Sequence, residues 1–393
     1  MASIEQIAPA ITAPSSRPRV LQVVTHLALG GAPSVALSLA SRLRNEFEFA
    51  VCAVNGVIRD GIGEAMQADL AAQGIPLFVG PRLPIKRGGL LLAGLALLRA
   101  VRRFRPDVIH LHTEIPEASY ATMVTLSPGV RRIPVIRTIH NSVYWRYWPR
   151  IGRWCDRRIG HCFVIAISQD ARDEFLRYRS DSGAGPLMQE PVIIYNGVAS
   201  PRRLKTPGRD PGRVRVLFGG RFEFQKGTDL LPAIFSRVRP PGNLIGEASL
   251  FGSGAHEPML RALAVDPPPG WNVHVHPPVA GLAERMADFD LVIVPSRFEG
   301  LALVAIEAAL CGVPIVGTDA PGLREVLPER HPWRAPAGDS EGFARCLQAA
   351  IDAPETWPAA VEEARQLARV RFNPATALAE HARWYARVAG RLG

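Results

Sequence analysis

The sequence predicts an α/β protein made of two doubly wound domains that face a cleft, and three observations support this class. Short runs of β-branched residues alternate with helix-like segments along the whole chain. Several runs, such as 192–194 and 292–294, are continuously apolar, as expected of parallel strands that helices cover on both faces. The pattern is interrupted once, at residues 200–212, where three prolines and two glycines remove any periodicity.

The strands expected in the first half of the chain are Arg19–Val24, Phe49–Val54, Ile75–Val79, Asp107–His112, Pro134–Ile139, Cys162–Ile167 and Pro191–Tyr195. Those expected in the second half are Arg213–Phe218, Glu247–Phe251, Trp271–Val275, Asp290–Val294 and Val313–Val316. Segments such as Ser34–Leu43 and Leu303–Leu310 have the length and composition of crossover helices, so each half is an α/β domain with a parallel sheet.

These elements predict the domain organisation. We expect five segments: a leader (1–18), a first Rossmann-like domain (19–199), a linker (200–212), a second Rossmann-like domain (213–374) and a terminal helix that packs back on the first domain (375–393). In doubly wound sheets ligands bind beyond the carboxyl ends of the strands, which places the expected site in the cleft.

Composition excludes several protein classes. The 393 residues are 47% apolar and 21% charged, which is typical of a globular chain with buried cores. The five cysteines include no Cys-x-x-Cys, so we expect no disulfide framework, no zinc ribbon and a cytoplasmic location. The longest apolar run, residues 88–98, is too short for a spanning helix, which needs about 20 residues.

Positive charge is concentrated in the first half. Residues 1–200 contain 23 Arg and Lys against 15 Asp and Glu, a net charge of +8, whereas residues 201–393 contain 23 against 21, a net charge of +2. A compositional preference for arginine explains the excess but not its position. The position indicates an anionic partner, such as a nucleotide or a membrane surface.

The most informative segment is 295–312. The strand that ends at Val294 is followed by Glu299-Gly300 and then by a helix-forming run. We expect Glu299 at the helix entrance and Glu307 about two turns inside, both facing the cleft. The amides of Gly300 and Leu301 would then lie at a positive helix end, where a diphosphate binds well. Either glutamate alone is more simply a capping or a solvated residue, but the two together after this strand favour a site.

Two cations form a second motif. Arg221 and Lys226 follow the strand that ends at Phe218-Gly-Gly220, and Lys226 is one of only three lysines in the chain. An Arg-x4-Lys is most often surface charge. Here the position after a buried strand favours two cations that converge on a departing diphosphate.

Together these motifs resemble those of the retaining glycosyltransferases of the GT-B fold, in the family 4, glycogen-synthase-like group. Glu299-x7-Glu307 is similar to the family's E-x7-E motif, and Arg221-x4-Lys226-Gly is similar to its donor-diphosphate motif. Further matches in the family's order are Gly30-Gly31, His140, and Gly252-x-Gly254. The family's counterpart of His140 lies near the donor sugar and its phosphate. His110 and His112, at the end of another strand, are also expected to extend into the cleft, but they carry less weight as site residues.

The resemblance implies a GT-B fold whose first domain binds the acceptor and whose second binds the nucleotide sugar. Catalysis falls to Glu299, Arg221, Lys226 and His140. Donor binding falls to Gly30, Gly31, Gly220, Gly252, Gly254, Gly300, Leu301 and Glu307. In the family the acceptor attacks the face that the nucleotide leaves, so Glu299 would hold the hexose hydroxyls and Glu307 the ribose. No metal and no resident cofactor is then expected. The competing Asp288-x-Asp290 is the type of motif that holds a divalent ion, but its place before a strand favours a structural role.

The implied partners are a UDP-, GDP- or ADP-sugar and a glycan or lipid-linked acceptor of surface polysaccharide or glycolipid synthesis, with no nucleic acid. Residues 143–158 mix aromatics with arginines and fit an element on the inner face of an anionic membrane as well as an ordinary crossover helix. For residues 88–104 the ordinary helix is favoured. The runner-up function is a nucleotide-sugar epimerase of the same fold, similar to the UDP-N-acetylglucosamine 2-epimerases, and a third is a non-catalytic sensor.

Overall fold

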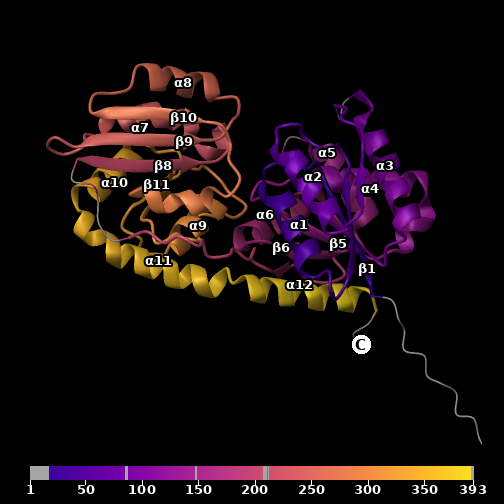
Figure 1. The fold of residues 1–393 in the computed structure, drawn as a ribbon. Coiled ribbons are helices and arrows are strands. Elements are labelled where there is room, and N and C mark those ends of the chain that lie inside the picture. Colours follow the sequence, from indigo (N-terminus) through magenta and orange to yellow (C-terminus); the bar gives the residue numbers. More distant parts are fainter. Residues whose placement is uncertain (1–16, 85–86, 147, 207–209, 211, 391–393) are drawn as a thin grey trace, which may run out of the picture.

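The computed structural model describes residues 17–84, 87–146, 148–206, 210 and 212–390. Nearly all of the expected leader and part of the expected linker lie outside this range. The described chain forms two lobes, each an α/β unit around one parallel sheet (Figure 1). The predicted fold class, two Rossmann-like domains, is confirmed.

The first lobe contains, among the described residues, a seven-stranded parallel sheet of order β3-β2-β1-β4-β5-β6-β7. Its strands are β1 Arg19–Val24, β2 Glu48–Ala53, β3 Leu77–Val79, β4 Val108–His112, β5 Val135–Ile139, β6 Phe163–Ala166 and β7 Val192–Ile193. Its helices are α1 Gly31–Arg42, α2 Ile62–Ala72, α3 Gly89–Phe104, α4 Glu114–Leu126, α5 Pro149–Ile159 and α6 Gln169–Ser182. The central strands β4 and β5 are buried along their whole length, because helices cover both faces.

The second lobe repeats the arrangement with six described strands in the order β10-β9-β8-β11-β12-β13. The strands are β8 Arg213–Gly219, β9 Ile245–Phe251, β10 Trp271–His276, β11 Leu291–Val294, β12 Ile315–Thr318 and β13 Arg334–Ala335. The helices are α7 Leu231–Arg237, α8 Glu257–Val265, α9 Leu303–Cys311 and α10 Ser340–Asp352. In both sheets the strand order reverses beside the first strand, and this switch point is where such folds bind ligands.

Two helices at the end of the chain connect the lobes. α11 (Trp357–Arg371) packs on α9, and α12 (Pro374–Val388) continues along the same side of the molecule beneath the first lobe (Figure 1). Tyr385 of α12 is completely buried and packs against Phe47 and Phe49 of the first lobe. The exact domain boundaries stay predictions.

Strand ends differ from the sequence-based expectation where proline or loop geometry intervenes. The strand expected at Val313–Val316 begins instead at Ile315, because Pro314 has no N–H to donate to a ladder. The strand expected at Pro191–Tyr195 shrinks to two residues, and the helix expected from Ser34 begins at Gly31.

Candidate active site

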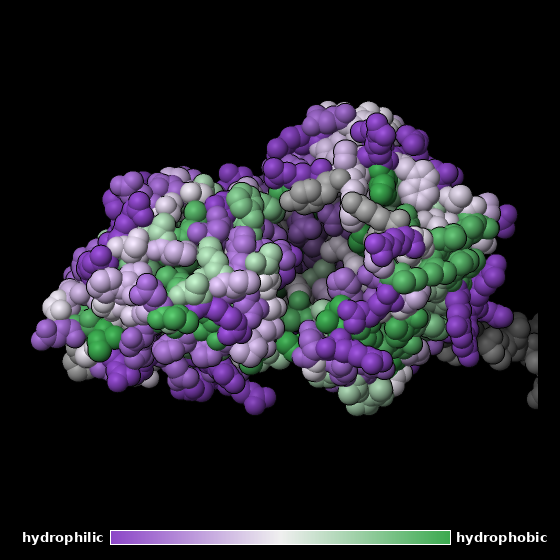
Figure 2. Space-filling view, turned by 90° about the horizontal axis from the view of Figure 1, so that it is seen from above, coloured by the Kyte–Doolittle hydropathy of each residue, from purple (hydrophilic) through white to green (hydrophobic). Residues whose placement is uncertain are grey.

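The candidate site lies where the carboxyl ends of the two sheets meet. The surface is hollowed between the lobes on this side (Figure 2). A side chain on Gly31, at the start of α1, would stand 3.5 Å from Leu303, the first residue of α9. The two helix starts therefore face each other across the cleft at short range.

Lys226 and Glu299 form the charged centre of the site. Lys226 Nζ donates to both carboxylate oxygens of Glu299, at 2.6 and 2.8 Å, and Ser296 Oγ donates to Oε1 at 2.7 Å. Glu299 is only 4% exposed. A carboxylate so far from water requires such partners, and here it has three short contacts.

Close backbone packing brings these two residues together. Gly227 has φ +64°, and a Cβ there would collide with the carbonyl oxygen of Pro295. The loop that carries Lys226 can therefore lie directly on the loop that carries Glu299 only because residue 227 is glycine. Gly220, at the end of β8, lies against the Lys226 stem, with its Cβ position 3.6 Å from Cδ and Cε.

Gly300 joins this centre to the first lobe. A Cβ on Gly300 would overlap the carbonyl oxygen of His140, just after β5, so the two backbones are in direct contact. Ser168 Oγ, at the N-cap of α6, donates to the Gly300 carbonyl at 2.6 Å. Within the described part of the chain the amides of Gly300 and Leu301 have no hydrogen-bond partner, which leaves two donors for a ligand beside Glu299.

The helix that follows begins at Leu303, as expected, but the two glutamates lie differently relative to its start. α9 starts at Leu303, so Glu299 lies four residues before it and Glu307 only one turn inside it, not two. Glu307 shares a helix face with Leu303, which borders the cleft. Glu307 is half-buried, and burial raises the pKa of its carboxyl to about 7.

Arg221 does not reach the Lys226–Glu299 pair. Its guanidinium donates to Glu223 at 3.0 Å and to Gln225 at 2.7 Å, and its side chain is 58% exposed. The sequence predicts that Arg221 and Lys226 converge on one point. In this structure Lys226 lies at Glu299, whereas Arg221 does not. Gln225 links the two regions, because its Nε2 donates to the carbonyl of Phe298, next to Glu299.

The glycines expected at the donor site have different surroundings. Gly30 is extended at the N-cap of α1, and it and Gly31 are exposed. Gly252 instead packs on the carbonyl of Gly220, and Gly254 on the backbone of Phe222. The close approach that Gly252 and Gly254 permit is thus between β9 and the loop after β8.

His140 is held by a buried chain of hydrogen bonds. Its Nε2 lies 2.9 Å from His112 Nδ1, His112 Nε2 lies 2.7 Å from Gln22 Oε1, and Gln22 Nε2 donates to Tyr385 Oη at 2.8 Å. His110 and His112 are completely buried, so they do not line the cleft as expected, whereas His140 is 9% exposed. Burial lowers the pKa of His140 to about 3, so its ring is neutral near pH 7.

The sequence interpretation missed an ionic seam between the lobes. Asp170, in the first turn of α6, accepts from the Gly322 amide at 2.6 Å and from Arg324. In return Glu325 accepts from the amides of Gln169 and Asp170, each at 2.9 Å. A carboxylate at a helix N-terminus is favourable, but the acid that caps α6 comes from the other lobe, 155 positions along the chain, and no local pattern reveals it.

Several alternatives from the sequence have structural roles instead. Asp288 pairs with Arg203, and Asp290 pairs with Lys205 at 2.7 Å while accepting from the Arg215 amide. No cluster of His, Cys, Asp and Glu among the described residues is arranged to hold a metal ion. Tyr144 and Trp145 are 4% and 3% exposed and belong to the core, which removes them from any membrane-binding surface; Tyr147 lies outside the described residues.

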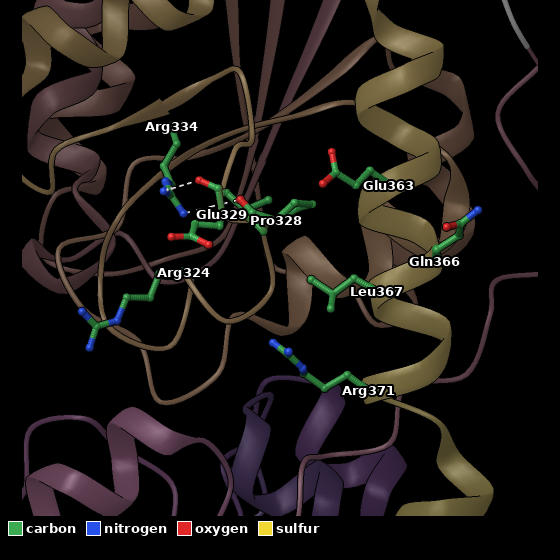
Figure 3. A pocket seen from close by; sticks show the side chains of 9 residues that line it. Arg324, Pro328, Glu329, Arg334, Glu363, Gln366, Leu367 and Arg371 are labelled. Atoms are coloured by element: carbon green, nitrogen blue, oxygen red, sulfur yellow. Dashed lines mark hydrogen bonds between the residues drawn. The ribbon is translucent and has the colours of Figure 1, made fainter.

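A pocket of about 650 Å³ lies away from this centre, between the loop 324–334 and α11 (Figure 3). Arg334 turns back onto the carbonyls of Pro328 and Glu329, and Arg371 donates to the Glu325 carbonyl. None of the residues expected at the donor site lines this pocket.

Comparison with known families gives two matches that together cover most of the chain. Residues 29–200 match the family described as "Glycosyltransferase Family 4", and residues 213–353 match the one described as "Glycosyl transferases group 1". The D-inositol 3-phosphate glycosyltransferase of Pseudarthrobacter chlorophenolicus is 34% identical over 294 residues, which are 68% of this chain and 69% of the relative. The glycogen synthase of Mycobacterium tuberculosis is 26% identical over 306 residues, 72% of this chain and 69% of the relative.

Solved structures agree with the fold. Anabaena HepE in complex with UDP and glucose superimposes with a TM-score of 0.75 at 20% identity, covering 94% of this chain and all of the other. Sucrose-phosphate synthase from Thermosynechococcus elongatus gives 0.74 at 16% identity, covering 95% of this chain and all of the other.

Proposed function

This chain belongs to the family 4 glycosyltransferases, and we propose that it moves a hexose-type sugar, with retention, from a nucleoside-diphosphate sugar to a hydroxyl of a glycan or lipid-linked acceptor. The proposed donors are UDP-, GDP- and ADP-sugars, and the proposed setting is surface polysaccharide or glycolipid synthesis. The epimerase alternative is not favoured, since the relatives described above are glycosyltransferases.

The observation that carries the proposal is the Lys226–Glu299 pair in contact with the first lobe through Gly300. An ammonium and a carboxylate whose side chains are 19% and 5% exposed lie together at the switch point of the second sheet. They suit a ligand that is anionic at one end and rich in hydroxyls at the other. A nucleotide sugar has this character.

Each group then has a distinct task. Glu299 accepts hydrogen bonds from hexose hydroxyls. Lys226 and the amides of Gly300 and Leu301 donate to the diphosphate, and their positive potential grows in value as the diphosphate leaves. Glu307, one turn into α9, binds the ribose.

Arg221 joins the site when the donor binds. Its present partners, Glu223 and Gln225, lie two and four residues away, and the side chains of Arg221 and Glu223 are 58% and 42% exposed. An exposed pair of this type contributes only about 0–1 kcal/mol. A diphosphate bound in the cleft carries more negative charge than Glu223 and is less solvated. Arg221 would therefore gain free energy by releasing Glu223 and binding the diphosphate.

The reaction then needs no enzyme nucleophile. The acceptor oxygen forms its bond to the anomeric carbon on the face from which the diphosphate departs, and its proton passes to the departing phosphate oxygen. We propose that no divalent ion takes part. Lys226 and Arg221 supply the positive charge, and both carboxylates of the Asp-x-Asp motif are already paired with cations.

A donor screen tests the proposal. The chain is mixed with UDP-, GDP- and ADP-sugars, and its melting temperature is measured. The correct donor at a hundred times its Kd should stabilise the fold by about 2.7 kcal/mol. Product NMR with a hydroxyl acceptor should then show the donor's anomeric configuration. A product with the inverted anomeric configuration refutes retention. Epimerisation of the donor sugar in the absence of acceptor would instead support the epimerase alternative.

We also propose that α3 makes the membrane contact that a lipid-linked acceptor requires, although the sequence favoured an ordinary helix over residues 88–104. Leu91 and Leu95 are 49% and 43% exposed on this helix, and Arg99 and Arg102 are exposed further along it. This apolar face beside arginines suits an anionic lipid surface at the cytoplasmic side. Among the described helices, none is both long and apolar enough to cross a bilayer. Co-sedimentation with anionic liposomes should fall for Leu91→Ser with Leu95→Ser, and an unchanged pellet refutes this assignment.

A further inference from the structure

The terminal helix α12 reaches the active site through buried hydrogen bonds. Gln22 on β1 and His110 on β4 are neighbours in the sheet, and both contact Tyr385 Oη at 2.8 Å. His112, two residues beyond His110, lies on the same sheet face because side chains alternate along a strand. The result is a continuous chain, from Tyr385 through Gln22 and His112 to His140.

Every group in this chain of hydrogen bonds is neutral. Burial lowers the pKa of His110 and His112 far below its ordinary value and that of His140 to about 3. A neutral imidazole has one protonated and one unprotonated nitrogen, so each ring must donate at one nitrogen and accept at the other.

The orientation of the Gln22 amide decides every proton along the chain. Gln22 Oε1 can only accept, so His112 carries its proton on Nε2. His112 Nδ1 must then accept, so His140 donates from Nε2. The free nitrogen of His140 is therefore Nδ1, with its lone pair. Among the described residues Nδ1 has no hydrogen-bond partner, and it is not sealed from solvent.

The other end of the chain satisfies the same requirement. Gln22 Nε2 donates to Tyr385 Oη, so the Tyr385 hydroxyl gives its own proton to His110 Nδ1. His110 must then donate from Nε2 to Thr138 Oγ1, at 2.6 Å. No donor faces a donor anywhere in the chain, and turning the Gln22 amide by 180° would reverse every proton in it.

We propose that Tyr385, Gln22 and His112 are positioning residues that hold His140 in the tautomer with the proton on Nε2, so that His140 presents a hydrogen-bond acceptor to the bound donor. This deepens the proposed function and rests on it. His140 then accepts from a sugar hydroxyl and cannot donate to the diphosphate. The helix that ends the chain, although remote from the reacting atoms, takes part in fixing the site.

Nitrogen-15 NMR of the full chain labelled at histidine tests the tautomer directly, and needs no turnover. The His140 signals are assigned from their loss in His140→Ala. In the wild-type protein near neutral pH we expect a proton on Nε2 and none on Nδ1. In Tyr385→Phe, which removes one oxygen and frees the Gln22 amide, we expect a mixture of the two tautomers. Protonation of wild-type His140 on Nδ1, or an unchanged spectrum in Tyr385→Phe, overturns the proposal.

Activity supplies a second readout. Tyr385→Phe should lower kcat/KM about three- to tenfold, because the hydrogen bonds to Gln22 and His110 are both lost, but the change reaches His140 only through the Gln22 amide. Tyr120→Phe is the matched control, because its hydroxyl is equally buried yet has no partner in the described chain, and it should have no effect.

A double-mutant cycle separates positioning from general destabilisation. Because the effect acts through His140, Tyr385→Phe should cost nothing further in the His140→Ala background. An equal loss in both backgrounds contradicts the proposal. Failure of the proposed function looks different, since no donor would be turned over while the tautomer result would stand.

Discussion

The two lobes face the cleft with different chemistry: the second lobe with the Lys226–Glu299 ion pair, here called the charged wall, and the first lobe with His140 and the groups that hold it, here called the neutral wall. On the second lobe, Lys226 and Glu299 form an ion pair at 2.6 Å. On the first lobe, His140 borders the cleft and is neutral, because burial disfavours its charged form. Under the proposed function, the ion pair of the second lobe binds both the diphosphate and the hexose hydroxyls, whereas the first lobe offers the same sugar a neutral acceptor at His140. Each prediction below tests this division, and the expected effects decrease in order.

Glu299→Gln should have the largest effect. The substitution keeps the shape of the side chain but leaves the ammonium of Lys226 without its anion and turns one acceptor into a donor. We expect kcat/KM to fall by about 10²–10³-fold, as for removal of other preorganised electrostatic groups. Steady-state kinetics measure this, with circular dichroism to show that the chain is folded. A loss below threefold would mean that the charged wall is not the donor site.

Lys226→Met should come next, with a loss of about a hundredfold in kcat/KM, because both donor binding and stabilisation of the departing diphosphate are weakened. Arg221→Met is the matched control on the same loop. Arg221 is exposed and pairs with Glu223, so it contributes only after it rearranges, and a loss of about tenfold is expected. Should Arg221→Met prove the more damaging of the two, the cationic centre lies elsewhere than the structure indicates.

Ser296→Ala sharpens the comparison within the charged wall. Ser296 donates to the same oxygen of Glu299 that Lys226 contacts, and it is fully buried. Loss of this bond should reduce kcat/KM about three- to tenfold, since a hydrogen bond to a charged group contributes roughly 1.5–3 kcal/mol and Lys226 compensates in part. Thr318→Val removes a hydroxyl that donates to the Ser296 carbonyl. It tests whether a change in the position of the Ser296 loop, without loss of the bond to Glu299, is enough to lower kcat/KM.

Asp170→Asn tests whether the walls must be held together. The Gly322 amide and Arg324 would lose an anionic acceptor across the seam, and we expect unfolding free energy to fall by about 1–3 kcal/mol. The effect on kcat should be smaller than that of any substitution above. Urea titration followed by tryptophan fluorescence gives the stability. An unchanged free energy of unfolding would show that the seam is not needed to hold the lobes together.

Glu307 gives the smallest effect, a pH dependence. Burial raises the pKa of its carboxyl to about 7, so the unbound protein holds this proton more tightly than an unfolded chain does. Its contribution to stability is therefore present at low pH and is lost as the pH rises through about 7. Donor affinity should instead increase over that range, because an ionised carboxylate accepts better from ribose hydroxyls.

Glu307→Gln is the test of this pH dependence. Titration calorimetry at several pH values should show a slope in the wild-type protein that the variant lacks. Glu114, whose pKa burial also raises to about 7, is unchanged in both proteins and cancels in the difference. Identical slopes would remove Glu307 from the donor site.

The sequence predicted the charged wall better than the neutral one. Alternation of strands and helices determines where each strand ends, and Lys226 and Glu299 are both identified by the strand that they follow. Their contact follows from neighbouring parallel strands, β8 and β11, whose carboxyl ends share one edge.

The neutral wall could not be predicted in the same way. Whether His110 and His112 enter the cleft or the core depends on Tyr385, more than 270 residues away, and on which sheet face α12 covers. Arg221 was misplaced for a similar reason, because its short-range partners Glu223 and Gln225 compete with any ligand. The interface position of Asp170 required knowing how the lobes meet, which no local pattern encodes.

The central claim is that the Lys226–Glu299 pair binds the nucleotide sugar. Calorimetric titration of the donor selected in the thermal screen, into the wild-type chain and into Lys226→Met, tests it most directly. We predict one site on the wild-type protein and binding at least tenfold weaker in the variant, about 1.4 kcal/mol. Equal affinity for both proteins would contradict the claim.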